Sequence, residues 1–526
     1  MSGRMNIATV YSAFTTGMTA EITSIEVSLS QGINIFEIIG LCDSSIKESR
    51  GRINAALKSN GFMMPRGHIT VSISPSYMHK SGTGFDLPIA IGILAVSNQI
   101  KFDPKQKIYA SGELSLKGDV LETPGSIIRL SEVKKTDFDK VFAPSKEANS
   151  IWLSGVDCSL ISNLSDLRNI ESLNISSVLN GDFLNVRPDF PLNPDLSMLK
   201  GQFKTSRAIE IAAAGWHNIL FIGTAGSGKT LGAEILYNLL PELSSDEFLD
   251  VYKIRNQTEI SGDGQISLLR PFVRMLPDSG MSKLYGSSSK LIPGDIPLSH
   301  NGVLFADEMC EMGNKTIDLL RQPIEKHIVT LKRDGKAYDF PSECLFVGAT
   351  NPCRCGNLLS NPSKCNCPTA VRKTYANRLS NPFFERIDIV TEMHEIDEEG
   401  LKAISGKTSE YENERIRERI RIVRQIQAER YSKFGLTNML NGKYEGDNLS
   451  DVFRCPETVT EHAVKAASLG GFSPRSYKRL MKVGRTIADL DERTDMTEKD
   501  INEALTYKLR RHDKKLNRGE AKSHWM

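Results

Sequence analysis

Residues 218–240 read NILFIGTAGSGKTLGAEILYNLL, and this stretch decides the fold of the central part of the chain. The unbroken apolar run NILFI predicts a buried strand, and LGAEILYNLL predicts a helix. Between them, Gly223-Thr-Ala-Gly-Ser-Gly-Lys229-Thr230 has the spacing of a phosphate-binding loop, in the strand–loop–helix context that such a loop requires. The stretch therefore predicts a nucleotide-binding α/β domain.

The loop carries the groups that ATP and its magnesium ion need. Backbone N–H groups of the glycine-rich turn would point at phosphate oxygens, and the following helix N-terminus would add a favourable partial charge. Lys229 is expected to reach the β- and γ-phosphates, and the Thr230 hydroxyl to bind Mg²⁺. The residues predicted to bind the nucleotide are Gly223, Gly226, Ser227, Gly228, Lys229, Thr230 and, from a later strand, Asp307. A glycine-rich turn without a ligand is the alternative.

Two further apolar runs end in polar residues suited to the same site. VLFA at 303–306 precedes Asp307 and Glu308, and we expect Asp307 to help bind Mg²⁺ and Glu308 to polarise the attacking water. LFVGAT at 345–350 precedes Asn351, which could orient that water or contact the γ-phosphate. A turn-capping role before Pro352 is the alternative for Asn351.

The length of 526 residues predicts about three domains. We expect a compact α+β domain over 1–185, a Pro-rich linker over 186–198, a parallel-sheet ATPase core over 199–395, and a helical subdomain with a basic tail over 396–526. Within the last, ENERIRERIRIVRQIQAERY places isoleucine and valine on one helix face.

Bulk composition indicates an ordinary water-soluble protein. Charged residues make up 25% and hydrophobic residues 40%, and no apolar stretch predicts a signal peptide or a membrane span. The expected location is therefore the cytoplasm, without a membrane partner. The net charge of only +2 requires any nucleic-acid contact to come from local basic patches.

The chain resembles the magnesium-chelatase-like AAA+ ATPases of the ComM/YifB type over nearly its whole length. Ordered motifs carry the resemblance: IIGLCDSSIKESRGRINAAL, GTGFDLPIAIGILA, SGELSLKGDV, EIAAAGWHNILFIGTAGSGKT, PGDIPLSHNGVLFADEM, NPCRCG, NPFFERIDIV and SPRSYKRLMKVGRTIADL. The resemblance implies Asn351 as sensor 1, Arg386 as an arginine finger reaching a neighbouring subunit, and Arg475 as sensor 2. It thereby implies a ring, expected to be a hexamer. Surface salt bridges are the alternative for both arginines.

The N-terminal region is similar to the domain shared with Lon protease, whose activity needs a Ser-Lys dyad. Here Ser126-Ile127-Ile128 stands where the lysine is expected, and Ser81 and Lys80 are adjacent in sequence and poorly placed to pair. We therefore expect no peptidase activity.

Four of the nine cysteines form a C-x-C, nine-residue, C-x-C array. Two close thiolate pairs on Gly/Asn/Pro/Ser-rich loops could wrap a tetrahedral Zn²⁺, whereas reduced free thiols and a redox function are the alternatives. The array consists of Cys353, Cys355, Cys365 and Cys367.

Two inserted segments and the tail are candidates for contact with DNA. Alternating residues around Asp334-Gly335 predict a hairpin, which would grip phosphates and a base with Lys332, Arg333, Lys336 and Tyr338. Residues 259–293 include Arg270, Arg274, Lys283 and Lys290, but RPFVRMLPDSG replaces the family's Arg-x-Pro-His-His pattern and puts an inherited role in doubt. The basic tail comprises Lys508, Arg510, Arg511, Lys514, Lys515, Arg518 and Lys522. Solvated basic turns and a frayed end are the alternatives.

The resemblance implies a DNA helicase or branch-migration motor in natural transformation or recombination, with single-stranded or branched DNA as its partner. A chelatase-like or chaperone-like ATPase that remodels a protein is the main alternative, and a nucleotide-gated scaffold is another. The ATP-site residues do not distinguish these, because ATP chemistry says nothing about the substrate.

Overall fold

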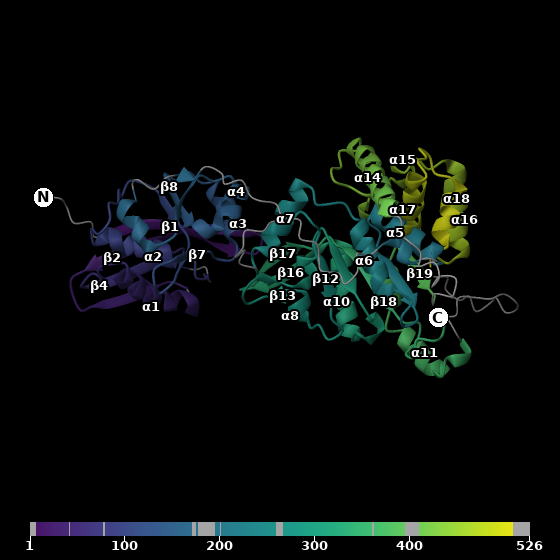
Figure 1. The fold of residues 1–526 in the computed structure, drawn as a ribbon, viewed down its shortest axis with the longest axis horizontal. Coiled ribbons are helices and arrows are strands. Elements are labelled where there is room, and N and C mark those ends of the chain that lie inside the picture. The colour runs from purple at the N-terminus through teal and green to yellow at the C-terminus, as the bar shows by residue number, and fades with distance from the viewer. Residues whose placement is uncertain are drawn as a thin grey trace.

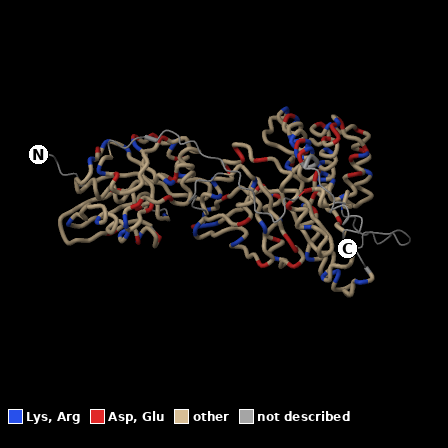
Figure 2. Tube along the Cα trace, viewed as in Figure 1, with Lys and Arg blue, Asp and Glu red and all other residues tan. Residues whose placement is uncertain are grey.

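The computed structural model describes residues 7–41, 43–76, 79–80, 82–170, 175–176, 195–199, 201–258, 267–359, 362–394 and 410–508. The molecule is elongated, with an N-terminal α+β domain at one end and the central sheet with the C-terminal helices at the other (Figure 1). Charges of both signs are spread along both parts (Figure 2). Ser81, the linker segment 177–194 and the tail beyond Lys508 lie outside the described residues.

The N-terminal domain is built on a mixed sheet in which helix α2 (Asp86–Val96) packs against β1 and β2. The sequence of β4 (His68–Ser74) shows that one face of this sheet lies on a core, because HITVSIS alternates buried and half-buried side chains. A Cβ on Gly92 would lie 2.4 Å from Val27, so glycine allows this close approach of α2 to β2. The sheet order is β10 (Ile175–Ser176), β9 (Cys158–Ile161), β8 (Lys140–Pro144), β5 (Ile108–Ala110), β1 (Ile7–Thr16), β2 (Thr19–Ser30), β4 (His68–Ser74) and β3 (Ile35–Ile39).

Three more helices complete this domain. Helix α1 (Ser44–Ser59) ends just before Gly61, which adopts a left-handed φ of 68°. The others are α3 (Ser126–Val133) and α4 (Ala148–Ser154).

The central domain contains the predicted parallel sheet. Its strand order is β12 (Phe272–Met275), β15 (Val303–Ala306), β18 (Leu345–Thr350), β11 (Ile219–Gly223) and β19 (Ile389–Met393). Ile219 and Phe221 face the core formed by α5 (Phe203–Gly215), α6 (Lys229–Leu239) and the C-terminal helices. Leu220 and Ile222 face the core under α10 (Asn314–Lys326). Burial on both faces explains the continuous apolar runs from which the strands were predicted.

The C-terminal region is helical, as predicted. Ile420 and Val423 of α14 are buried, and Ile416 packs against the same core. The helices are α14 (Glu410–Ser432), α15 (Leu449–Val452), α16 (Glu457–Leu469), α17 (Pro474–Leu490) and α18 (Glu498–Leu505). None of the helices in the described part of the chain combines the length and apolar character needed to cross a bilayer.

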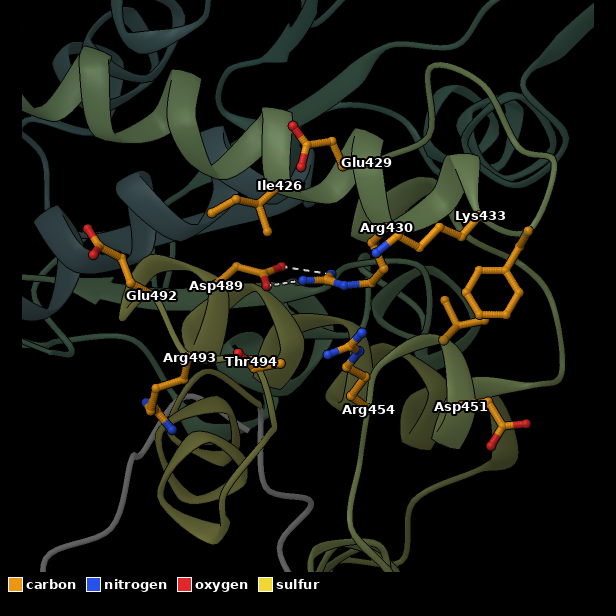
Figure 3. A pocket seen from close by; sticks show the side chains of 12 residues that line it. Ile426, Glu429, Arg430, Lys433, Asp451, Arg454, Asp489, Glu492, Arg493 and Thr494 are labelled. Carbon is orange, nitrogen blue, oxygen red and sulfur yellow. Dashed lines mark hydrogen bonds and ion pairs between the residues drawn. The ribbon is translucent and has the colours of Figure 1, made fainter.

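A cavity of about 310 Å³ lies among these helices (Figure 3). Arg430 and Asp489 form an ion pair across it, while Lys433, Arg454 and Glu492 also line it. Because acidic and basic side chains are balanced there, the cavity does not select an anion or a cation by charge.

Helix α7 (Ser245–Arg255) joins the N-terminal domain to the central one. The Asn256 side-chain oxygen accepts hydrogen bonds from Ile127 N and from Ser126 Oγ, both at 3.2 Å. The backbone carbonyl of Asn256 accepts a third from Gly125 N at 2.7 Å. Asn256, at the end of α7, thus caps the start of α3 across the boundary, and Tyr252 packs against the core beneath α3 and α4.

Replacing Asn256 with Ala should lower stability by about 1 kcal/mol, the usual value of a helix cap. The Ile127 amide and the Ser126 hydroxyl would lose the side-chain oxygen to which they donate. Differential scanning calorimetry should show the loss, and limited proteolysis should cut faster between the two domains. Unchanged unfolding and proteolysis would show that Asn256 does not hold the domains together.

Candidate nucleotide-binding site

The predicted phosphate-binding loop connects β11 to α6. Gly226 and Gly228 have φ values of 78° and 87°, a left-handed conformation that glycine adopts without strain. A Cβ on Gly223 would lie 2.5 Å from the Ser227 hydroxyl, and that hydroxyl donates to Thr224 O at 2.9 Å. The glycines are therefore required for the compact shape of this loop.

Lys229 is the first residue of α6, and its side chain bonds back to the loop. Its Nζ donates to Gly223 O at 2.9 Å, to Thr224 O at 2.6 Å and to Asn351 Oδ1 at 3.0 Å. Burial lowers the pKa of this amine, while the nearby carboxylates of Asp307 and Glu308 oppose the shift. Lys229 and Asn351, which lie 122 positions apart, thus meet at the ends of two adjacent strands.

Thr230 and Asp307 also meet. The Thr230 hydroxyl donates to Asp307 Oδ2 at 3.2 Å, and the Asp307 side chain is only 14% exposed. A hydroxyl and a carboxylate are the hard oxygen ligands that Mg²⁺ prefers, so this pair fits the ion. Glu308 follows with a φ of 49°, is exposed, and donates its backbone N–H to Asp307 Oδ1 at 2.9 Å.

Arg274 was missed as a member of this site. It lies on β12, beside β15, and its Nη2 donates to Asp307 Oδ2 at 2.7 Å. The only signal in the sequence was a basic residue in a short apolar run, FVRM, which had no assigned place in the sheet.

The other arginine of residues 259–293, Arg270, is buried rather than exposed. It bonds to Glu247 at 2.8 Å, donates to Asn301 O at 2.8 Å and lies over the Trp216 ring. Burial acts to raise the pKa of Glu247, but Arg270 outweighs it and lowers that pKa to about 2. Lys283 and Lys290 are exposed.

Arg386 and Arg475 share one carboxylate. Both guanidinium groups form ion pairs with Glu325 on α10, Arg386 from the loop after α12 (Asn381–Phe384) and Arg475 from the start of α17. The structure therefore brings the two arginines together, in the salt bridges that were the alternative interpretation of each. Ion pairing within one subunit does not test a role toward a second one.

The predicted hairpin is present as β16 (Ile328–Arg333) and β17 (Lys336–Pro341), with Asp334-Gly335 at the tip. It differs from the expectation in what it exposes. Tyr338 is half-buried against Gly17 of the N-terminal domain, where a Cβ added to the glycine would lie 3.4 Å from the Tyr338 Cβ. Arg333 forms a hydrogen bond with His79 of the same domain at 2.5 Å. These two side chains face the N-terminal domain because its β1–β2 turn packs on the hairpin. Lys332 and Lys336 are exposed.

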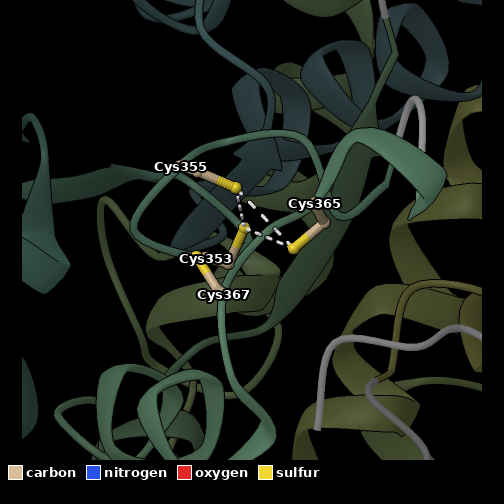
Figure 4. Close-up of side chains that lie close together, drawn as sticks. All are labelled: Cys353, Cys355, Cys365 and Cys367. Carbon is tan, nitrogen blue, oxygen red and sulfur yellow. Dashed lines mark hydrogen bonds between the residues drawn. The ribbon is translucent and has the colours of Figure 1, made fainter.

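The four cysteines of the array converge (Figure 4). Their sulfur atoms lie within 4.8 Å of one another, and the Cys353–Cys355, Cys353–Cys365 and Cys355–Cys365 separations are 3.4, 3.7 and 3.7 Å. Four sulfurs at about 2.3 Å from a tetrahedral zinc ion would be about 3.8 Å apart. The array thus has the ligand type and spacing that a zinc ion requires.

The remaining candidates lie apart from this site. Lys80 is fully buried and donates to Pro75 O, and its proposed neighbour Ser81 lies outside the described residues. Ser126 bonds to Ser150 at the domain boundary. In the tail, Lys508 is half-buried, and desolvation lowers its pKa to about 7.

Comparison with known proteins gives matches along most of the chain. A family model described as Magnesium chelatase, subunit ChlI matches residues 195–401. Two further models match 25–147 (Subunit ChlI of Mg-chelatase) and 410–508 (Magnesium chelatase, subunit ChlI C-terminal). Competence protein ComM of Haemophilus influenzae is 33% identical, covering 96% of this chain and 98% of that protein. The uncharacterized protein YifB of Escherichia coli is 30% identical, covering 96% and 97%. Magnesium-chelatase subunit ChlI of Euglena gracilis is 23% identical over 195 residues.

If the cysteine array holds zinc, protein purified without a His tag should contain about one equivalent per chain by plasma mass spectrometry. Replacing Cys353 and Cys365 with Ser should remove it, because two of four ligands are lost. Cys455→Ala, in the C-terminal helices, is the matched control and should keep the metal. Less than a tenth of an equivalent in the unaltered protein would refute the zinc assignment.

Proposed function

This chain belongs to the magnesium-chelatase-like AAA+ ATPase family that includes ComM and YifB, and we propose that it is an ATP-driven motor acting on DNA. The observation that carries the ATPase part is the meeting of Lys229 and Asn351 beside Thr230 and Asp307. The DNA part is supported by the name of the Haemophilus relative, which connects that protein with competence. Natural transformation or recombination is the process we propose.

The side chains divide the work of ATP hydrolysis. Lys229 exchanges its carbonyl and amide partners for the β- and γ-phosphates, while loop N–H groups and the start of α6 bind the remaining oxygens. Thr230 and Asp307 hold Mg²⁺, which when bound neutralises charge on the phosphates. Glu308, exposed beside them, polarises the attacking water, and Asn351 orients it from the end of β18.

Two cations complete the proposed site from a neighbouring subunit. Since Arg386 and Arg475 share Glu325, we propose that both act on the same triphosphate, where they stabilise charge developing in the transition state. A site that needs a second subunit couples hydrolysis to ring assembly, and a hexamer is the proposed ring.

Lys229→Ala should lose ATP binding, because the cation that faces the phosphates is removed. Glu308→Gln should bind ATP normally and hydrolyse it at least about a hundredfold more slowly, the lower end of the usual range for a general base. Equilibrium binding of a fluorescent ATP analogue and steady-state phosphate release measure the two effects. Normal nucleotide affinity of Lys229→Ala would refute the assigned role of the loop.

The exposed part of the hairpin is the proposed DNA contact. Lys332 and Lys336 can neutralise phosphates without any rearrangement, whereas Arg333 and Tyr338 would first have to leave the N-terminal domain. We therefore assign backbone contact to the two lysines, and base stacking by Tyr338 to a state in which the domains separate.

A motor that remodels a protein partner is the second candidate, and the descriptions of the matching family models, which name magnesium chelatase, favour it. The two candidates share every ATP-site residue. They differ in whether DNA changes the rate of hydrolysis.

Single-stranded DNA at low salt should raise the ATPase rate, and Lys332→Ala/Lys336→Ala should lose most of that increase because two phosphate contacts are removed. Lys465→Ala/Lys499→Ala removes the same charge from exposed positions of α16 and α18 and is the matched control. An ATPase rate that no DNA changes would favour the protein-remodelling function instead.

A further inference from the structure

One oxygen of Asp307 serves two donors. Asp307 Oδ2 accepts from Thr230 Oγ1 at 3.2 Å and from Arg274 Nη2 at 2.7 Å. Thr230 and Asp307 are the pair that fits Mg²⁺, so the guanidinium of Arg274 lies at the oxygen on which the ion would depend. No other residue in the described parts of the chain forms an ion pair with Asp307.

The sheet places Arg274 there. Arg274 pairs in register with Phe305 on the adjacent strand β15, and its guanidinium lies 5.7 Å from the centre of the Phe305 ring. Asp307 follows two residues later, at the end of β15. With its side chain 54% exposed, Arg274 can turn away from Asp307 without disturbing the core.

Two cations already lie among the carboxylates at Asp307. Lys229 and Arg274 are cations, and Asp307 and Glu308 are anions, all at the carboxyl end of the sheet. A divalent cation added alone would share Asp307 with Arg274 and would be repelled by it. The triphosphate brings negative charge that can receive the guanidinium and supply further oxygen ligands to the ion.

We infer that Arg274 competes with Mg²⁺ for Asp307, so that the metal enters this site together with the nucleotide rather than before it. The inference rests on the proposed function, in which Thr230 and Asp307 hold the ion. Binding of metal and release of Arg274 are then linked. The free energy of the Arg274–Asp307 ion pair must be spent before the metal binds, so it weakens the affinity of the nucleotide-free protein for metal by the same amount.

Mn²⁺ titration of the full-length, nucleotide-free protein, followed by electron paramagnetic resonance, tests the inference without measuring activity. Arg274→Ala should tighten Mn²⁺ binding about two- to fivefold, the range expected for removing a partly exposed ion pair. Arg274→Lys, which keeps the charge, should recover part of the competition, and Lys283→Ala is the control for loss of an exposed positive charge that does not contact Asp307. In Glu308→Gln saturated with ATP, the effect of Arg274→Ala on Mn²⁺ affinity should shrink.

Unchanged or weaker Mn²⁺ binding by Arg274→Ala would overturn the inference, because the guanidinium would then be neutral toward the metal or would help it. Asp307→Asn separates this result from a failure of the proposed function. If Asp307→Asn abolishes Mn²⁺ binding while Arg274→Ala leaves it unchanged, only the competition is wrong. If Asp307→Asn has no effect, the metal site itself is wrong and the inference fails with it.

Discussion

The nucleotide site depends on the bonds of one half-buried amine. Lys229 Nζ donates to two carbonyls of its own loop and to Asn351 Oδ1, and so joins the end of β11 to the end of β18. Burial penalises its charge, and only these acceptors and the carboxylates nearby compensate. A phosphate group offers stronger acceptors to the same cation. ATP binding would therefore weaken the bond from Lys229 to Asn351 that connects the two strand ends.

Each of the three arginines assigned to ATP hydrolysis or to its regulation is held by a carboxylate. Arg274 bonds to Asp307, and Arg386 and Arg475 bond to Glu325. Each of these pairs can be broken by a triphosphate, since phosphate competes with carboxylate for guanidinium. Nucleotide binding and subunit contact would therefore replace existing ion pairs with new ones and would leave no charge unpaired. The free energies of the nucleotide-free and nucleotide-bound states would then differ little.

Sequence patterns predicted the parts of this fold whose cause is local. The apolar strands were found because burial on both faces requires a continuous run of apolar residues. The loop was found because its left-handed backbone favours glycine. The cap of α3 by Asn256, the ion pair of Arg274 and the cover over Tyr338 were not found, because each joins segments distant in the chain. Charge alone suggested DNA contact for Arg270, but only the packing shows that it is buried with Glu247.

The structure of Glu308→Gln with ATP and Mg²⁺, solved by electron cryomicroscopy, tests the assigned nucleotide site most directly. We expect Lys229 to contact the β- and γ-phosphates, the ion to lie between Thr230 and Asp307, and Arg386 of the next subunit to approach the γ-phosphate. A nucleotide bound elsewhere, with Lys229 still bonded to Asn351 and its loop carbonyls, would contradict the assignment of this site.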